Sequence, residues 1–244
     1  MTDLYMIRHG QATSNVEPVI ADFKGNYNLT RFGVLQAERL RDRLAATGEI
    51  AADVLISSSV PRARQTAEII APALKLPVIL DDEVQELRFG EADGMTQAEL
   101  RENFGIPDLR TNPFRQIAPG GENWGQFVLR VSTALDRIIR EQNGKTIVLV
   151  CHGGVIDSSF LFFFGMNTLT LPQAQFYTRN TSITHWQQDN YNNEQLQWRL
   201  ERYNDDIHLR DMNTGKRIRW EDVAAQPVAG QDESAVPLPT EQQS

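Results

Sequence analysis

The sequence predicts an α/β fold, a three-layer α/β/α sandwich in which helices cover both faces of a mostly parallel central sheet. Short apolar runs alternate with segments of helical periodicity up to about residue 164, and this alternation is typical of parallel sheets with helical crossovers. Two of the apolar runs end directly in a His-Gly pair. The 244 residues are enough for one large domain with a sizeable core.

The first apolar run, residues 4–7, predicts a buried strand, and Gly10 behind it predicts a turn. Arg8 and His9 therefore stand side by side where the strand leaves the sheet. Ligand sites in open α/β sheets form at the carboxyl ends of strands. A permanent cation beside an imidazole is suited to bind and attack a phosphoryl group. The alternative, from these two residues alone, is an edge-strand arginine beside a packed histidine.

The second unit places another arginine at the end of a strand. Thr30 is a good N-cap for a helix over residues 31–44. Residues 53–56 then predict a buried strand, and Pro61 fits the first turn of the helix that follows. Arg62 consequently lies at a helix N-terminus, where backbone N–H groups and the helix dipole favour an anion. A solvated arginine is the alternative interpretation.

The middle of the chain predicts one more strand, a loop and two helices. The strand covers residues 77–80 and leads into a turn-rich loop, residues 81–94, which holds Glu86. Thr96 is placed to cap a short helix, and the apolar stripe of residues 121–142 predicts a long amphipathic helix.

The clearest strand pattern is residues 146–150, which are β-branched and apolar and end in Cys151 and His152-Gly153. A buried helix is predicted after it, over residues 155–164, and a late pair of strands over residues 182–186 and 194–202.

The end of the chain differs in composition. From about residue 221 it turns to Pro, Gln, Ala and Ser, with few large apolar side chains. We therefore expect one domain, residues 1–220, followed by a disordered or loosely packed tail, residues 221–244.

Charge and cysteine content exclude several classes of function. The chain has 32 acidic and 24 basic residues, a net charge of −8, so nucleic acid and anionic membranes are poor partners. One cysteine allows no internal disulfide and no cysteine-rich metal site. The apolar residues 160–164 are too few to span a bilayer and no signal peptide pattern is visible, so we expect a cytoplasmic location. The oligomeric state cannot be predicted from the sequence.

Five motifs in order resemble the histidine phosphatase superfamily, which includes cofactor-dependent phosphoglycerate mutases and broad-specificity phosphatases. The resemblance covers roughly residues 3 to 165 and departs from the family at Asn123, where serine is usual. Asparagine caps a helix about as well. The matching motifs are Arg8-His9-Gly10 with Asn15, the run Ser57-Ser-Ser-Val-Pro-Arg62-Ala-Arg-Gln-Thr-Ala67, Glu86-Leu-Arg-Phe-Gly90, Pro119-Gly-Gly-Glu122, and His152-Gly153.

The resemblance implies a phosphoglycerate mutase-like fold and assigns a role to each matching residue. His9 would be the nucleophile, forming a phosphohistidine that water hydrolyses, and Glu86 the general acid and base. Glu83, Glu91 and Asp93 are rival carboxylates in the same loop. His152 would be most useful protonated. The residues implied to hold the phosphoryl group are Arg8, Asn15, Arg62, His152 and Gly153.

The resemblance leaves a phosphatase and a mutase open, because both use the same phosphoenzyme. The known mutases carry a longer insertion between the acid/base glutamate and the second His-Gly, and often Arg-x-Tyr-Gly after that glutamate. Here the separation is 66 residues, the difference between positions 152 and 86, and the loop reads Leu87-Arg88-Phe89-Gly90. These features favour a phosphatase. The alternatives are a cofactor-dependent phosphoglycerate mutase or an inactive relative that binds phosphorylated ligands.

Other chemistries lack their motifs. A cysteine phosphatase needs an arginine six positions after Cys151, where Asp157 stands. The sequence has no Gly-x-x-x-x-Gly-Lys-Ser/Thr loop, no Gly-x-Ser-x-Gly elbow and no cluster with metal-ligand spacing. We therefore expect metal-independent activity without a cofactor, on a small phosphorylated metabolite. Its identity would be set by residues 16–28 and 88–120, in which no specificity motif is visible.

Overall fold

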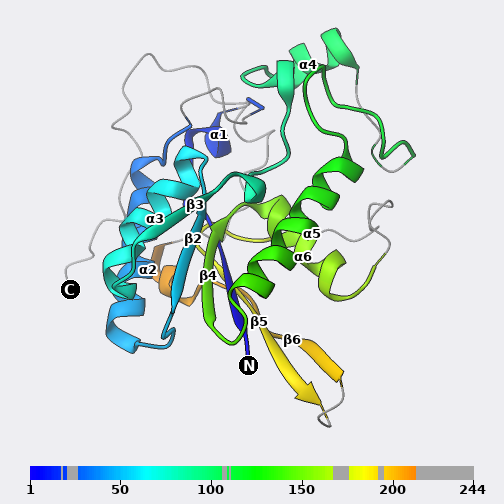
Figure 1. Cartoon of the computed structure of the whole chain (residues 1–244). Helices are drawn as coiled ribbons and strands as arrows, with labels where there is room; N and C mark the ends of the chain where they lie inside the picture. The colour runs from blue at the N-terminus through cyan, green and yellow to red at the C-terminus, as the bar shows by residue number, and fades with distance from the viewer. Residues whose placement is uncertain are drawn as a thin grey trace, which may run out of the picture.

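The computed structural model describes residues 1–17, 19–20, 27–105, 109, 111–166, 176–191 and 195–212. The predicted tail, residues 221–244, lies outside the described residues, as do parts of the two segments expected to set specificity. The described residues form the predicted α/β sandwich around one six-stranded sheet (Figure 1).

The sheet is mixed, with strand order β3-β2-β4-β1-β5-β6. The first four of these strands are mutually parallel, while β5 pairs antiparallel with β1, and β6 with β5. The late pair is therefore a long hairpin at the edge of the sheet, and it extends beyond the predicted ranges. The strands are β1 (Asp3–Arg8), β2 (Val54–Ser58), β3 (Val78–Asp81), β4 (Thr146–Cys151), β5 (Ile183–Tyr191) and β6 (Gln195–Asp205).

Local capping chemistry sets the ends of the helices. Thr30 and Thr96 accept hydrogen bonds from the backbone as predicted. The long amphipathic helix begins three residues later than predicted, because Asn123 caps it and Gly120 before it has a positive φ of 71°. The helices are α1 (Thr13–Val16), α2 (Arg31–Thr47), α3 (Pro61–Leu74), α4 (Gln97–Phe104), α5 (Trp124–Glu141) and α6 (Gly153–Phe163), with 3₁₀ turns at Asp82–Val84, Gly90–Ala92 and Ile207–Met212.

Two apolar cores lie on opposite faces of the sheet. Leu4 and Met6 of β1 face α5 and α6, and their neighbour Ile7 faces α2 and α3. This alternation is the period-2 pattern of a strand buried on both faces. Figure 1 shows the pairs of helices on either side of the sheet, with α1 and α4 near the end where the parallel strands finish.

The loop after β1 is pressed against the start of α2. A Cβ atom placed on Gly33 would lie 1.9 Å from the carbonyl oxygen of Gln11, closer than any side chain permits. Glycine at this position allows the backbone of the loop to pass against the helix. The loop that carries His9 is thereby fixed by backbone packing.

Candidate active site

His9 follows β1 and is held by backbone contacts. The backbone N–H of His9 donates to the carbonyl oxygen of Cys151 at 3.0 Å. The backbone carbonyl oxygen of His9 accepts from Asn180 Nδ2 at 2.9 Å. The ring lies with Nδ1 2.7 Å from the carbonyl oxygen of Gly10. A carbonyl can only accept, so Nδ1 carries the proton and the lone pair is on Nε2. Arg62 Nε donates to that Nε2 at 3.2 Å.

The second predicted histidine lies beside the first. His152 follows β4, the strand next to β1, and the two rings meet edge to face with centroids 5.2 Å apart. Nε2 of His152 shares a hydrogen bond of 2.8 Å with Ser58 Oγ at the end of β2. Its Nδ1 is buried and has no hydrogen-bond partner among the described residues. The carboxyl ends of three neighbouring strands, β2, β4 and β1, therefore bring Ser58, His152 and His9 together.

Arg8 and Arg62, the two arginines predicted for the site, both lie near His9. Arg62 lies in the first turn of α3 and is 3% exposed. Nη1 of Arg8 donates to the carbonyl oxygen of Thr178, while its Nε is buried without a hydrogen-bond partner among the described residues. A Cβ atom placed on Gly153 would lie 3.7 Å from that Nε. A protein with a net charge of −8 thus concentrates buried positive charge at one edge of its sheet.

Burial, together with the neighbouring guanidinium groups, keeps the two imidazoles neutral. The pKa of His9 is lowered well below 6.5 by burial first, then by Arg62 and Arg8. Burial and the same arginines also lower the pKa of His152 well below that value. The imidazole of His9 is therefore unprotonated at neutral pH. His152 was expected to be most useful protonated, but without a bound anion it is neutral as well.

Glu86 lies at the N-terminus of α6, beside Gly154. The cluster of Arg8, His9, Arg62, Glu86 and His152 is called the cup. Oε1 of Glu86 accepts from the Leu87 N–H and its Oε2 from the Gly154 N–H, both at 3.0 Å. A Cβ atom on Gly154 would lie 2.3 Å from Oε1, so the carboxylate occupies space that a side chain there would fill. Its charge also reaches Arg8. The rival Glu83 is 53% exposed and pairs instead with Arg88.

Arg130 holds the Glu86 loop, a role that the sequence did not reveal. From α5 its guanidinium donates to the carbonyl oxygens of Glu83, Gln85 and Glu86 at 2.8, 3.0 and 3.1 Å. It also binds both carboxylate oxygens of Glu122, at 2.6 and 2.7 Å. Glu122 therefore supports the loop from outside. An arginine on the polar face of an amphipathic helix carries no pattern that distinguishes it from a solvated one.

Asn15 lies in α1, at the rim of the cup. Its Oδ1 accepts from the Ala12 N–H at 2.9 Å and from Asn180 Nδ2 at 3.4 Å. The oxygen is thus occupied, and the amide NH₂ is the end left to donate to a ligand. Asn180, which also binds the carbonyl of His9, is a second residue that no sequence motif marks.

The described residues offer neither a metal site nor a membrane span. No group of three or more His, Cys, Asp or Glu residues there is arranged to hold a metal ion. None of the helices in those residues is long and apolar enough to cross a bilayer.

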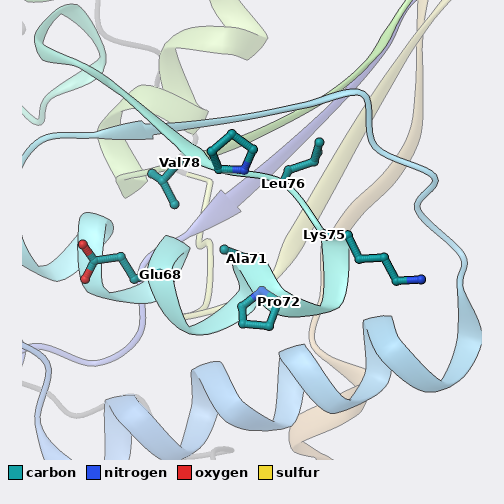
Figure 2. Close-up of a pocket in the computed structure, with 7 residues that line it drawn as sticks. Glu68, Ala71, Pro72, Lys75, Leu76 and Val78 are labelled. Atoms are coloured by element: carbon teal, nitrogen blue, oxygen red, sulfur yellow. The ribbon is translucent and has the colours of Figure 1, made fainter.

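A separate hollow of about 390 Å³ lies beside the C-terminal end of α3 (Figure 2). Arg62 is in the first turn of this helix, and the lining residues on the helix follow it by 6 to 13 positions, which is roughly 9 to 20 Å along the axis at 1.5 Å per residue. None of the predicted site residues lines the hollow, which is distinct from the cup. Its lining residues are Glu68, Ala71, Pro72, Lys75, Leu76, Pro77 and Val78.

A neutral imidazole flanked by two guanidinium groups and a carboxylate, at the carboxyl edge of an α/β sandwich, is suited to a phosphoryl group. The chain matches the family model of the histidine phosphatase superfamily (branch 1) over residues 4–206. The protein belongs to this superfamily, and the resemblance seen in its motifs is confirmed.

The names of its relatives include both phosphatase and mutase. The bifunctional protein Rv2228c of Mycobacterium tuberculosis is 33% identical over 194 residues, which cover 74% of this chain and 52% of that protein. The chain thus spans about half the length of the first curated relatives that it matches. A 2,3-bisphosphoglycerate-dependent phosphoglycerate mutase of a Methylobacterium species is 27% identical over 182 residues, or 72% of this chain and 86% of the mutase.

A solved structure supports the same fold. A mutant phosphoserine phosphatase of Entamoeba histolytica, in complex with phosphoserine, matches with a TM-score of 0.67 at 25% identity. The match covers 86% of this chain and all of that one.

Proposed function

We propose that this protein is a phosphatase that hydrolyses small phosphomonoesters through a phosphohistidine on His9, with Glu86 as the general acid and base. The observation that carries the proposal is the state of His9. Its Nδ1–H is fixed on the Gly10 carbonyl, so the lone pair of Nε2 lies beside Arg62. A neutral imidazole oriented in this way can attack a bound phosphoryl group once Arg62 Nε turns from Nε2 to a phosphoryl oxygen.

In the first step, Nε2 of His9 forms a bond to phosphorus as the bond from phosphorus to the ester oxygen breaks. Glu86, protonated, gives its proton to the departing oxygen, and the alcohol leaves. The negative charge of a bound phosphoryl group favours the protonated form of a nearby carboxyl group. A positioned general acid of this kind contributes about 10²–10⁴-fold.

In the second step, water replaces the histidine. The Glu86 carboxylate takes a proton from water as its oxygen attacks phosphorus, and the bond between phosphorus and Nε2 breaks. Inorganic phosphate leaves and His9 is again neutral. Two lower barriers thereby replace one high barrier.

The remaining site residues would stabilise charge on the transferring group. Arg8 Nε and His152 Nδ1 are buried donor atoms without a hydrogen-bond partner among the described residues, and an anion in the cup would satisfy them. Arg62 already contacts the nucleophile, and Asn15 and the Gly153 N–H complete the proposed set. Removing one donor from such a site typically costs about 10²–10³ in kcat.

The proposed activity needs no metal ion. The two guanidinium groups supply the positive charge that a divalent cation supplies in other phosphoryl-transfer enzymes. No cofactor is proposed. Activity should therefore persist in excess EDTA.

We favour hydrolysis over mutase activity on the short separation between Glu86 and His152 and on the Arg88-Phe89-Gly90 sequence after the glutamate. Relatives bearing each name exist. With 3-phosphoglycerate and a trace of the 2,3-bisphosphate, the protein should release phosphate. Rapid isomerisation without phosphate release would identify a mutase instead.

The first experiment is hydrolysis of p-nitrophenyl phosphate by the purified protein, with and without EDTA, beside the His9→Ala variant. The expected result is EDTA-resistant turnover that the substitution abolishes. Absence of turnover on any phosphomonoester would favour a binding protein, and turnover by His9→Ala would exclude His9 as the nucleophile.

A further inference from the structure

Asp157 is a largely buried carboxyl group beside the cup that neither proposed step uses. It lies in α6, one turn after Gly153 and Gly154, the residues that pass against Arg8 and Glu86. Side chains on a helix lean toward its N-terminus and cover the preceding turn. Asp157 therefore covers the turn that contacts the proposed clamp and the proposed acid.

The carboxyl group of Asp157 has an unsatisfied atom. Its Oδ1 is buried and makes no hydrogen bond within the described residues. The Nε of Arg8 is also buried and makes no hydrogen bond there, although the charge of Arg8 reaches Asp157. An acceptor and a donor left open on the same side of one site, in a protein whose other buried polar groups are mostly paired, indicate a missing ligand.

The charges around Asp157 locate it relative to the proposed chemistry. Burial, then the charge of Glu86, raise its pKa from 3.8 to about 7, and Arg8 opposes them. The pKa of Tyr203, on β6, is raised by burial first and also by the charge of Asp157. The preceding turn of α6 approaches both Arg8 and Glu86, so Asp157 lies close to the proposed clamp and the proposed acid. Glu86 must touch the leaving oxygen in order to protonate it, and a carboxyl group close to Glu86 is then near the leaving alcohol.

We infer that Asp157 selects the leaving group, accepting a hydrogen bond from a hydroxyl or ammonium group on the alcohol and disfavouring a carboxylate there. The inference rests on the proposed function, because it takes Glu86 as the group that protonates the ester oxygen. The substrate class is then phosphorylated polyols or amino alcohols rather than phosphorylated acids. A second carboxylate on the same wall repels an anionic leaving group, and the repulsion grows as Asp157 ionises.

The test compares kcat/KM for phosphoethanolamine, glycerol 3-phosphate and 3-phosphoglycerate, each divided by the value for p-nitrophenyl phosphate, at pH 6 and pH 8. Asp157→Asn removes the charge and keeps the shape, whereas Asp157→Ala also removes the acceptor. Asp136→Asn makes the same chemical change on the exposed face of α5, where that carboxylate pairs with Arg140. Thermal unfolding of each variant checks that it folds.

At pH 8 we expect Asp157→Asn to lower the phosphoethanolamine ratio by at least about tenfold, the effect of losing one hydrogen bond to a charged group. The 3-phosphoglycerate ratio should rise several-fold, and both changes should shrink at pH 6. Asp157→Ala should also lower the glycerol 3-phosphate ratio, and Asp136→Asn should change none of them.

Unchanged ratios would overturn the inference while leaving the proposed function intact, and they can arise in two ways: each kcat/KM stays at its wild-type value, or each falls by the same factor, p-nitrophenyl phosphate included. The second would mean that Asp157 has a structural role only. Failure of the wild-type protein to hydrolyse p-nitrophenyl phosphate would instead remove the proposed function, and the inference with it.

Discussion

Replacing Arg130 by methionine should release the loop that carries Glu86. The guanidinium makes five hydrogen bonds, three to loop carbonyl oxygens and two to Glu122, and its side chain is 7% exposed. Methionine keeps most of the buried aliphatic length and removes every donor. The carboxylate of Glu122, 13% exposed, would lose its charged partner and keep the Arg88 N–H.

Removing one partner of a buried ion pair costs about 3–5 kcal/mol, because the other charge stays buried. The loop carbonyls lie near the surface and can regain water, so we place the loss for Arg130→Met near the lower bound, about 3 kcal/mol. A displacement of Glu86 by about 1 Å would cost up to about 10²-fold in the acid-dependent step. Activated aryl phosphates need little protonation of the leaving oxygen and should lose less than about threefold.

The assay pairs urea unfolding with kcat/KM for glycerol 3-phosphate and p-nitrophenyl phosphate. The control is Arg140→Met on the same helix, where the guanidinium is 77% exposed; a surface pair of this kind is worth about 0–1 kcal/mol. A stability loss below about 1 kcal/mol for Arg130→Met, or equal activity losses on the two substrates, would refute the role of Arg130 in holding the loop.

Three further predictions test other parts of the site. Glu86→Gln should reduce hydrolysis of alkyl phosphates about 10²-fold or more and of aryl phosphates much less; equal losses in kcat would remove Glu86 from the acid role. Stability should fall below about pH 6.5, by about 1.4 kcal/mol per pH unit for each of His9 and His152, because the unfolded chain takes up protons that the lowered pKa values exclude from the folded one. Urea titrations at pH 7.5 and 5.5 measure this fall, and a flat profile would mean that the two rings are not buried neutral. For Asp157 the pH dependence of stability is opposite. Because its pKa is raised to about 7 in the folded protein, the unfolded chain releases the proton more readily, and stability is lost as pH rises from about 4 to 7. Asp157→Asn should therefore stabilise the protein at pH 8, by at most about 4 kcal/mol in urea unfolding, and a destabilised variant would contradict the burial of an unpartnered carboxylate.

The fold was predictable because short-range chemistry specifies most of its elements. Thr30 and Thr96 cap helices, and the apolar run of residues 146–150 is a strand buried on both faces. The long helix was predicted three residues too early because an apolar stripe does not mark the first helical residue, whereas the cap at Asn123 sets the start at Trp124. Propensity alone does not resolve such boundaries.

The site was predictable where residues follow strand ends, because the topology of a parallel sheet brings those ends to one edge. Arg8, His9 and His152 were found in this way, and the structure places them together. Arg130 and Asn180 were missed because their roles depend on contacts between distant segments and on backbone carbonyls that no motif records.

The most direct test of the account is the chemistry of the bond formed between the protein and the substrate phosphoryl group. Brief incubation with labelled substrate, followed by rapid denaturation and peptide mapping, should place phosphate on His9 as an acid-labile, base-stable adduct that is absent from His9→Ala. A base-labile, acid-stable adduct would indicate an acyl phosphate on a carboxylate and would contradict nucleophilic attack by this imidazole.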